Sequence, residues 1–133
     1  MNLQETENLG QKIFSEKSEV LFAYLYGSFL KTKFYEDIDI GIIIKDDFKP
    51  NVFYEAKIAK QFEAAFKKNF DIRILNEMPL RFLYVLLKNS KLLFSRDDNQ
   101  RVKFESRVLT EYLDLKPHHD RYERMRKLKY GIG

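Results

Sequence analysis

The chain has 133 residues, of which 44% are hydrophobic and 33% charged, as expected for a soluble globular domain with its own core. No apolar run approaches the roughly 20 residues of a membrane span, and the first ten residues lack the basic and apolar regions of a signal peptide. Cysteine is absent, which excludes disulfides and thiolate metal sites and fits a reducing compartment. We therefore expect a cytoplasmic protein without membrane association.

The net charge of +4 is unevenly distributed along the chain. Residues 1–76 hold 11 Lys and Arg against 12 Asp and Glu, a net of −1, whereas residues 77–133 hold 13 against 8, a net of +5. Most of the excess lies in the final segment, which predicts a domain over residues 1–115 followed by a basic tail over 116–133. We expect the tail to contact a partner protein or a second copy of the chain; a solvated helix face is the alternative. Direct nucleic-acid binding is not expected, because the tail lacks a pattern of aromatic residues for base stacking.

Hydrophobic periodicity predicts four helices and four strands in the order helix, strand, strand, helix, strand, helix, strand, helix. Their expected positions are 3–17, 20–26, 37–44, 52–68, 70–75, a helix that starts at Pro79, 91–95, and a helix that starts at Asp97 or Asp98.

The last predicted helix has an apolar stripe that we expect to face the core. Its members are Val102, Leu109, Tyr112 and Leu113. Pro117 is expected to end this helix, because proline lacks the N–H that continues the hydrogen-bond ladder.

Carboxylates stand at the start of two predicted strands. Side chains alternate across a strand, so Asp37 and Asp39 point to one face while Ile38 points to the other. Asp71 opens a later strand. If these strands are neighbours, three carboxylates converge on one edge of the sheet, which is the arrangement that two-metal phosphoryl chemistry requires. A solvated strand end is the alternative interpretation.

The first buried strand ends in Gly27-Ser28, ahead of the carboxylates. Glycine allows close approach of a phosphate, and Ser28 offers a hydroxyl and a backbone N–H to phosphate oxygens. Lys31 and Lys33 follow in a cationic linker. This arrangement favours phosphate binding over the alternative of an ordinary turn.

Together these residues resemble the minimal nucleotidyltransferases of the DNA polymerase β superfamily. The shared features are a strand ending in Gly27-Ser28, a short linker, the Asp37-x-Asp39 pair and a third aspartate, Asp71, on a later strand. The resemblance spans residues 10–115. It implies an α/β (α+β) fold of the polymerase β palm type, with a small mixed sheet and flanking helices.

The resemblance also implies a mechanism and a partner. The family's catalytic and metal-binding positions match Asp37, Asp39 and Asp71, which would hold two Mg²⁺ ions. Its nucleotide-binding positions match Gly27 and Ser28, to which Lys31 and Lys33 would add positive charge.

Relatives of this kind pair with a HEPN-domain ribonuclease toxin, which implies that the chain is an antitoxin that transfers AMP from ATP to a protein acceptor. The alternative is a non-catalytic antitoxin or binding module that neutralises its partner by steric cover.

Overall fold

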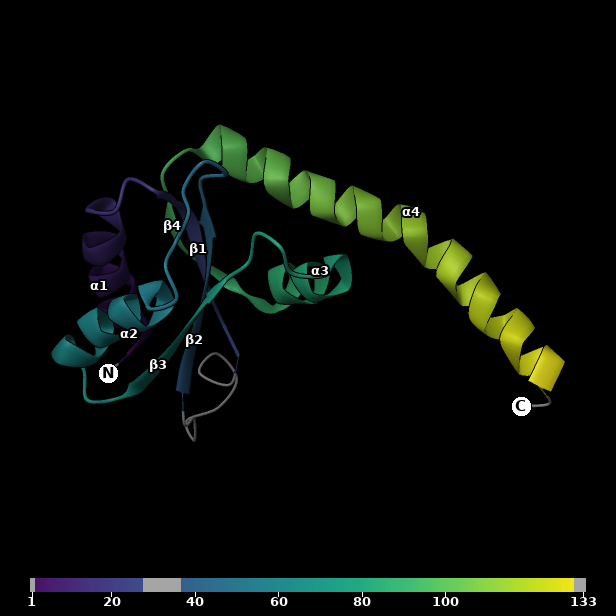
Figure 1. Ribbon diagram of the computed structural model, residues 1–133, viewed down its shortest axis with the longest axis horizontal. Helices are drawn as coiled ribbons and strands as arrows, with labels where there is room; N and C mark the ends of the chain where they lie inside the picture. Colours follow the sequence, from purple (N-terminus) through teal and green to yellow (C-terminus); the bar gives the residue numbers. More distant parts are fainter. Residues whose placement is uncertain (1, 28–36, 131–133) are drawn as a thin grey trace.

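The computed structural model describes residues 2–27 and 37–130, with residues 115–130 described by their backbone alone. Within these residues, four helices and four strands follow one another in the predicted order (Figure 1). The helices are α1 (Leu3–Ser15), α2 (Tyr54–Ala65), α3 (Leu80–Asn89) and α4 (Asp98–Tyr130). The strands are β1 (Val20–Tyr26), β2 (Asp37–Ile44), β3 (Asn69–Ile74) and β4 (Lys91–Ser95).

The strands form one mixed sheet in the order β3-β2-β1-β4. Strand β1 runs antiparallel to β2 and to β4, whereas β2 and β3 are parallel and are joined by the crossover helix α2. The predicted small mixed sheet with flanking helices is confirmed.

Each face of the sheet is covered by a different pair of helices (Figure 1). On the side of α1 and α2, alternate residues of β2 are fully buried, namely Ile38, Ile40 and Ile42. On the side of α3 and α4, Phe22 and Ile43 belong to a second apolar cluster. Burial of one such side chain contributes about 1.5–3 kcal/mol, so the two faces together hold the sheet between its helices.

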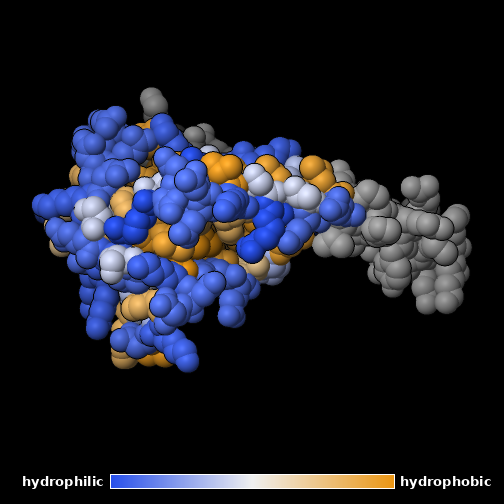
Figure 2. Space-filling view, turned by 90° about the horizontal axis from the view of Figure 1, so that it is seen from above, coloured by the Kyte–Doolittle hydropathy of each residue, from blue (hydrophilic) through white to orange (hydrophobic). Residues whose placement is uncertain are grey.

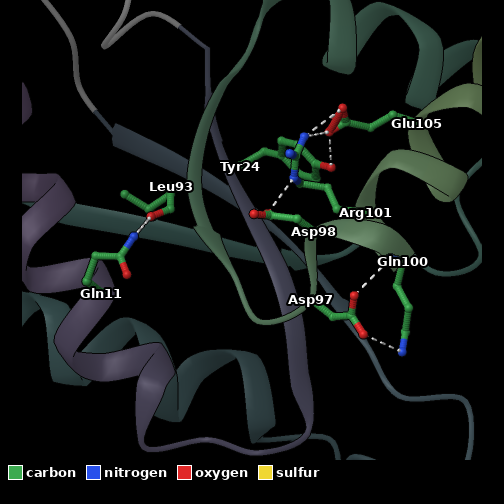
Figure 3. Close-up of polar contacts among 8 residues, drawn as sticks. All are labelled: Gln11, Tyr24, Leu93, Asp97, Asp98, Gln100, Arg101 and Glu105. Carbon is green, nitrogen blue, oxygen red and sulfur yellow. Dashed lines mark hydrogen bonds and ion pairs between the residues drawn. The ribbon is translucent and has the colours of Figure 1, made fainter.

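A polar network joins the start of α4 to the sheet (Figure 3). Tyr24 on β1 donates its hydroxyl to Glu105 Oε2 at 2.8 Å, and Glu105 in turn pairs with Arg101 at 3.1 Å. Burial, together with the hydrogen bond to Glu105, raises the pKa of the Tyr24 hydroxyl above its ordinary value. The tyrosine therefore stays a neutral donor, which suits its place beneath α4.

The predicted inward stripe of α4 is largely wrong. Val102, Leu109 and Leu113 are 51%, 41% and 56% exposed, whereas Val108 is 1% exposed and faces the sheet. Tyr112, the fourth member of the stripe, does face inward: it is half-buried and stacks on Tyr84 of α3 with ring centroids 4.0 Å apart. The buried side of the helix includes charged Arg101 and Glu105, which satisfy each other, so hydrophobicity alone indicated the wrong face. Apolar side chains consequently appear along the outer surface of α4 (Figure 2).

The prediction that Pro117 ends the last helix is also wrong. Helix α4 continues through Pro117 to Tyr130 and leaves the body of the molecule (Figure 1). Proline removes one backbone hydrogen bond and crowds the preceding turn, but the residues after it include good helix formers such as Arg, Glu, Met, Leu and Lys. Within the parts of the chain that the structure describes, no helix is apolar enough over a sufficient length to cross a membrane.

Candidate active site

The candidate site lies at the sheet edge where β1 ends and where β2 and β3 begin. Because β1 is antiparallel to β2 and β2 is parallel to β3, these three strand ends share one edge. In the strand register, Tyr26 pairs with Asp39, and Asp39 pairs with Asp71. The topology therefore places the end of β1 and two carboxylates side by side across three neighbouring strands.

The three predicted aspartates share one face of the sheet. Asp37 and Asp39 are two residues apart on β2, and the register partner of Asp39 is Asp71, so all three project toward the α3 side. This is the face on which Ile43 packs, farther along β2. The predicted convergence of Asp37, Asp39 and Asp71 on one edge and one face is what the strand register shows.

The carboxylates affect one another electrostatically. Burial raises the pKa of Asp39 above its ordinary value, and the nearby charges of Asp71 and Asp37 raise it further, against a lowering by Arg73. Like charges so placed repel, and a cation between them would relieve that repulsion. Mg²⁺ prefers carboxylate oxygens as protein ligands and keeps other coordination positions for water and substrate phosphates. The three carboxylates are therefore of the chemical type that the predicted metal site requires.

Gly27 brings the backbone of β1 against the Asp39 carboxylate. It has a φ of +86°, and among the described residues it is the one glycine with a positive φ. A Cβ built on Gly27 would collide with Asp39 Oδ2. Glycine is required at this position for two reasons, its conformation and its closeness to the carboxylate.

The other predicted nucleotide-binding residues, Ser28, Lys31 and Lys33, lie outside the described residues. Their roles remain predictions.

Two residues that sequence analysis did not select belong to this site. Arg73 lies two residues after Asp71 on β3, on the same face, and its Nη2 pairs with Asp71 Oδ2 at 3.4 Å. Tyr26, the register partner of Asp39, packs edge-on against Phe82 of α3 with ring centroids 6.4 Å apart. The alternation of Asp71 and Arg73 along one strand was the signal that could have identified Arg73.

The ion pair with Arg73 affects whether the Asp71 carboxylate is free to bind a metal ion. Both side chains of the pair are 44% exposed, so solvent screens the interaction and Asp71 is weakly held. Within residues 2–27 and 37–114, no three His, Cys, Asp or Glu side chains are grouped closely enough to enclose a metal ion. As a metal ligand, Asp71 would exchange its contact with Arg73 for one with the cation.

Solved structures with the same fold are known. A tri-AMPylated Shewanella oneidensis HEPN toxin in complex with MNT antitoxin matches with a TM-score of 0.67 and 18% identity over 98% of each chain. A toxin–antitoxin with AMP-PNP matches with a TM-score of 0.67 and 17% identity, over 96% of this chain and 98% of that one. The toxin–antitoxin MntA–HepT matches with a TM-score of 0.66 and 17% identity, over 98% of this chain and 99% of that one.

Sequence comparison identifies the family. No curated protein matches the chain significantly. The family model described as polymerase beta, nucleotidyltransferase matches residues 8–99, which is well over half of the chain and includes all three aspartates and Gly27. The predicted resemblance is thus confirmed, and the chain belongs to the polymerase beta nucleotidyltransferase family.

Proposed function

We propose that this protein is a Mg²⁺-dependent nucleotidyltransferase that transfers AMP from ATP to a protein acceptor, and that the acceptor is a HEPN-type toxin to which it is the antitoxin. The observation that carries the proposal is the register Tyr26–Asp39–Asp71, which places Asp39 beside Asp71 and brings Gly27 against the Asp39 carboxylate. Family membership supports the reaction type. The AMPylated toxin and the AMP-PNP complex among proteins of the same fold support the donor and the acceptor.

The carboxylates would divide the chemistry between them. Asp37 and Asp39 would hold two metal ions. When bound, the metal supplies charge neutralisation for the triphosphate and lowers the pKa of the attacking hydroxyl. Asp71 would either complete the ligand set of the second ion or take the proton of the acceptor hydroxyl.

The phosphates would be held by the end of β1 and the linker that follows. Gly27 lets the backbone at the end of β1 lie close to the Asp39 carboxylate, where a phosphate bound to a metal ion would be held, and Ser28 would donate hydrogen bonds to its oxygens. Lys31 and Lys33 would balance the negative charge. The acceptor oxygen forms a bond to the α-phosphorus while the bond from that phosphorus to pyrophosphate breaks, so AMP remains on the acceptor.

The second candidate is a non-catalytic antitoxin that covers its partner. The ion pair between Arg73 and Asp71 favours it, because it engages the third carboxylate with a cation of the protein itself. Under this alternative the complex forms and neutralises the toxin without nucleotide transfer.

We propose that residues 116–133 form the partner-contact segment that follows the domain at 1–115. The backbone of α4 extends away from the body up to Tyr130 (Figure 1), and the segment carries a positive excess. An extended cationic helix adds contact surface to the body of the protein. An acidic surface of a partner protein, or of a second copy of the chain, could bind to it through opposite charge.

Labelled ATP separates the two candidates. The protein is incubated with Mg²⁺, α-labelled ATP and a HEPN-type toxin, and transfer of label to the toxin is followed. The Asp37→Asn/Asp39→Asn variant should transfer none, whereas Asp46→Asn/Asp47→Asn, which makes the same charge change in the exposed loop after β2, should transfer normally. Neutralisation of the toxin without any transfer, equal in wild type and in Asp37→Asn/Asp39→Asn, would establish the steric alternative.

A further inference from the structure

A cavity lies at the opposite end of β1 and β2 from the aspartates. Its volume is about 530 Å³, and it is bordered by the start of β1, the end of β2 and the first turns of α4. Small-molecule sites commonly span about 300–1,000 Å³. The cavity residue Ile43 lies four positions beyond Asp39 along β2, or about 13 Å at the usual strand rise. A ligand here would therefore occupy a separate site.

The floor of this cavity is aromatic. Phe22 of β1 is 2% exposed, and Phe104 of α4 packs against it with ring centroids 5.6 Å apart and planes at 37°. Phe104 is half-buried, so part of its ring remains open to the cavity. Figure 2 looks onto the end of the sheet where α4 begins and shows apolar surface enclosed by hydrophilic side chains there. An accessible aromatic ring in a recess favours a ligand with a planar body.

The rim of the cavity is cationic and unpaired. Lys45 follows β2, and Lys103 and Arg107 stand on α4, where all three side chains are exposed. Among the described residues none of the three forms an ion pair, whereas Arg101 on the same helix pairs with Asp98 and Glu105. Asp46 is the one carboxylate among the lining residues, which leaves a local excess of positive charge.

The spacing of Lys103 and Arg107 favours binding of an anion between them. Lys103 and Arg107 are four residues apart, so they are neighbours on one side of α4 and repel each other. An anion between them replaces that repulsion with two charge-assisted hydrogen bonds. We refer to Phe22, Phe104, Lys45, Lys103 and Arg107 together as the cationic pocket.

We propose that the cationic pocket binds a nucleoside monophosphate group, with its base against Phe104 and its phosphate between Lys103 and Arg107. The aromatic floor accounts for the planar base and the unpaired rim for the phosphate, and the volume suits one nucleotide. Base stacking on an aromatic side chain and a phosphate held by lysine and arginine are the general chemistry of nucleotide recognition. The site does not depend on the aspartates, so it stands independently of the proposed transfer reaction.

The proposal is tested by titrating AMP into the protein by calorimetry, in EDTA so that the metal-dependent site is silent. Lys103→Ala/Arg107→Ala should weaken AMP binding by about tenfold or more, since it removes two charge-assisted contacts. Phe104→Leu, which keeps an apolar side chain in the core, should weaken it by about tenfold through loss of stacking. Lys60→Ala, which removes an exposed cation of α2 on the other side of the sheet, and Asp37→Asn/Asp39→Asn should both bind AMP like the wild type.

Four further outcomes discriminate. AMP affinity that is unchanged in Lys103→Ala/Arg107→Ala, with the fold verified by circular dichroism, would overturn the proposal. The proposal would also be overturned if inorganic phosphate bound as tightly as AMP, or if Phe104→Leu bound AMP as tightly as the wild type does. In either case the pocket would not recognise a planar group. A 5′-phosphorylated dinucleotide that competes with AMP would support it and would identify an oligonucleotide end as a source of the same group.

Discussion

Gly27→Ala is the sharpest test of the geometry at the candidate active site. An alanine here meets two penalties, because the backbone has a φ of +86° and the added Cβ collides with Asp39 Oδ2. The left-handed conformation costs a residue with a Cβ about 1–2 kcal/mol. The colliding atom is the tip of a side chain, so the Asp39 carboxylate should swing aside rather than force the strands apart.

The expected result is therefore a modest loss of stability with a large loss of function. The free energy of unfolding should fall by about 1–2 kcal/mol, measured by chemical denaturation. Affinity for Mg·ATP, measured by calorimetry, should fall by about 10–100-fold, as is common when a metal ligand loses its orientation.

A second glycine supplies the matched control. In Gly10→Ala the new Cβ would lie 2.8 Å from Leu93 Cγ, in the core between α1 and β4 and away from the aspartates. Overpacking of this kind costs about 1–3 kcal/mol, so Gly10→Ala should lose comparable stability and keep its Mg·ATP affinity. The reasoning fails if Gly27→Ala binds Mg·ATP like the wild type, or if Gly10→Ala loses as much affinity.

Four further outcomes are expected. Asp37→Asn/Asp39→Asn should remain folded by circular dichroism while losing Mg·ATP binding in calorimetry, because the change removes two of the negative charges that attract a divalent ion. The folded-state pKa of Asp39 is raised above its unfolded-state value, so any stability linked to its protonation is present below the unfolded-state pKa and is lost as the pH rises. Asp39→Asn should therefore increase the free energy of unfolding at about pH 7 and change it little at about pH 3. Tyr24→Phe should cost about 1 kcal/mol in denaturation, since it removes the hydrogen bond to Glu105; an unchanged midpoint would show that this bond contributes nothing net. Deletion after Leu115 should leave the melting temperature nearly unchanged and weaken complex formation, and a truncated chain that unfolds would show instead that the tail belongs to the core.

The strands of the sheet were predictable because their signals are local. The apolar run of β1, the alternation of β2 and the turn residues between them set boundaries at Val20–Tyr26 and Asp37–Ile44, as predicted. Helix α2 spans Tyr54–Ala65 and is shorter at both ends than the expected 52–68; Val52 and Phe53, ahead of its first turn, are 88% and 64% exposed. An apolar side chain near a helix start says little about whether the helix includes it.

The orientation of α4 was not predictable in the same way. Its buried face depends on a pair of charges, Arg101 and Glu105, that become compatible with burial only because they meet each other and Tyr24 in the folded chain. No hydrophobic pattern registers a contact between residues 81 positions apart in the sequence. The stripe of Val102, Leu109 and Leu113 is apolar and yet exposed, and it is available to a partner.

At the candidate active site, one face of the sheet carries charged side chains in place of the apolar side chains that stabilise the rest of it. Along one face of β2, the apolar position Ile43 gives way to Asp39 and Asp37 toward the edge, where burial and repulsion raise the pKa of Asp39. Burial and repulsion make the charged form of Asp39 unfavourable in the isolated fold, and groups perturbed in this way are typical of functional sites. Arg73 offsets part of this cost while it pairs with Asp71, which makes it a protein-derived counter-charge in the absence of a ligand. In the proposed reaction a metal ion or a triphosphate would compete with Arg73 for Asp71 or engage Arg73, and the guanidinium, once released from Asp71, would be suited to bind a phosphate oxygen.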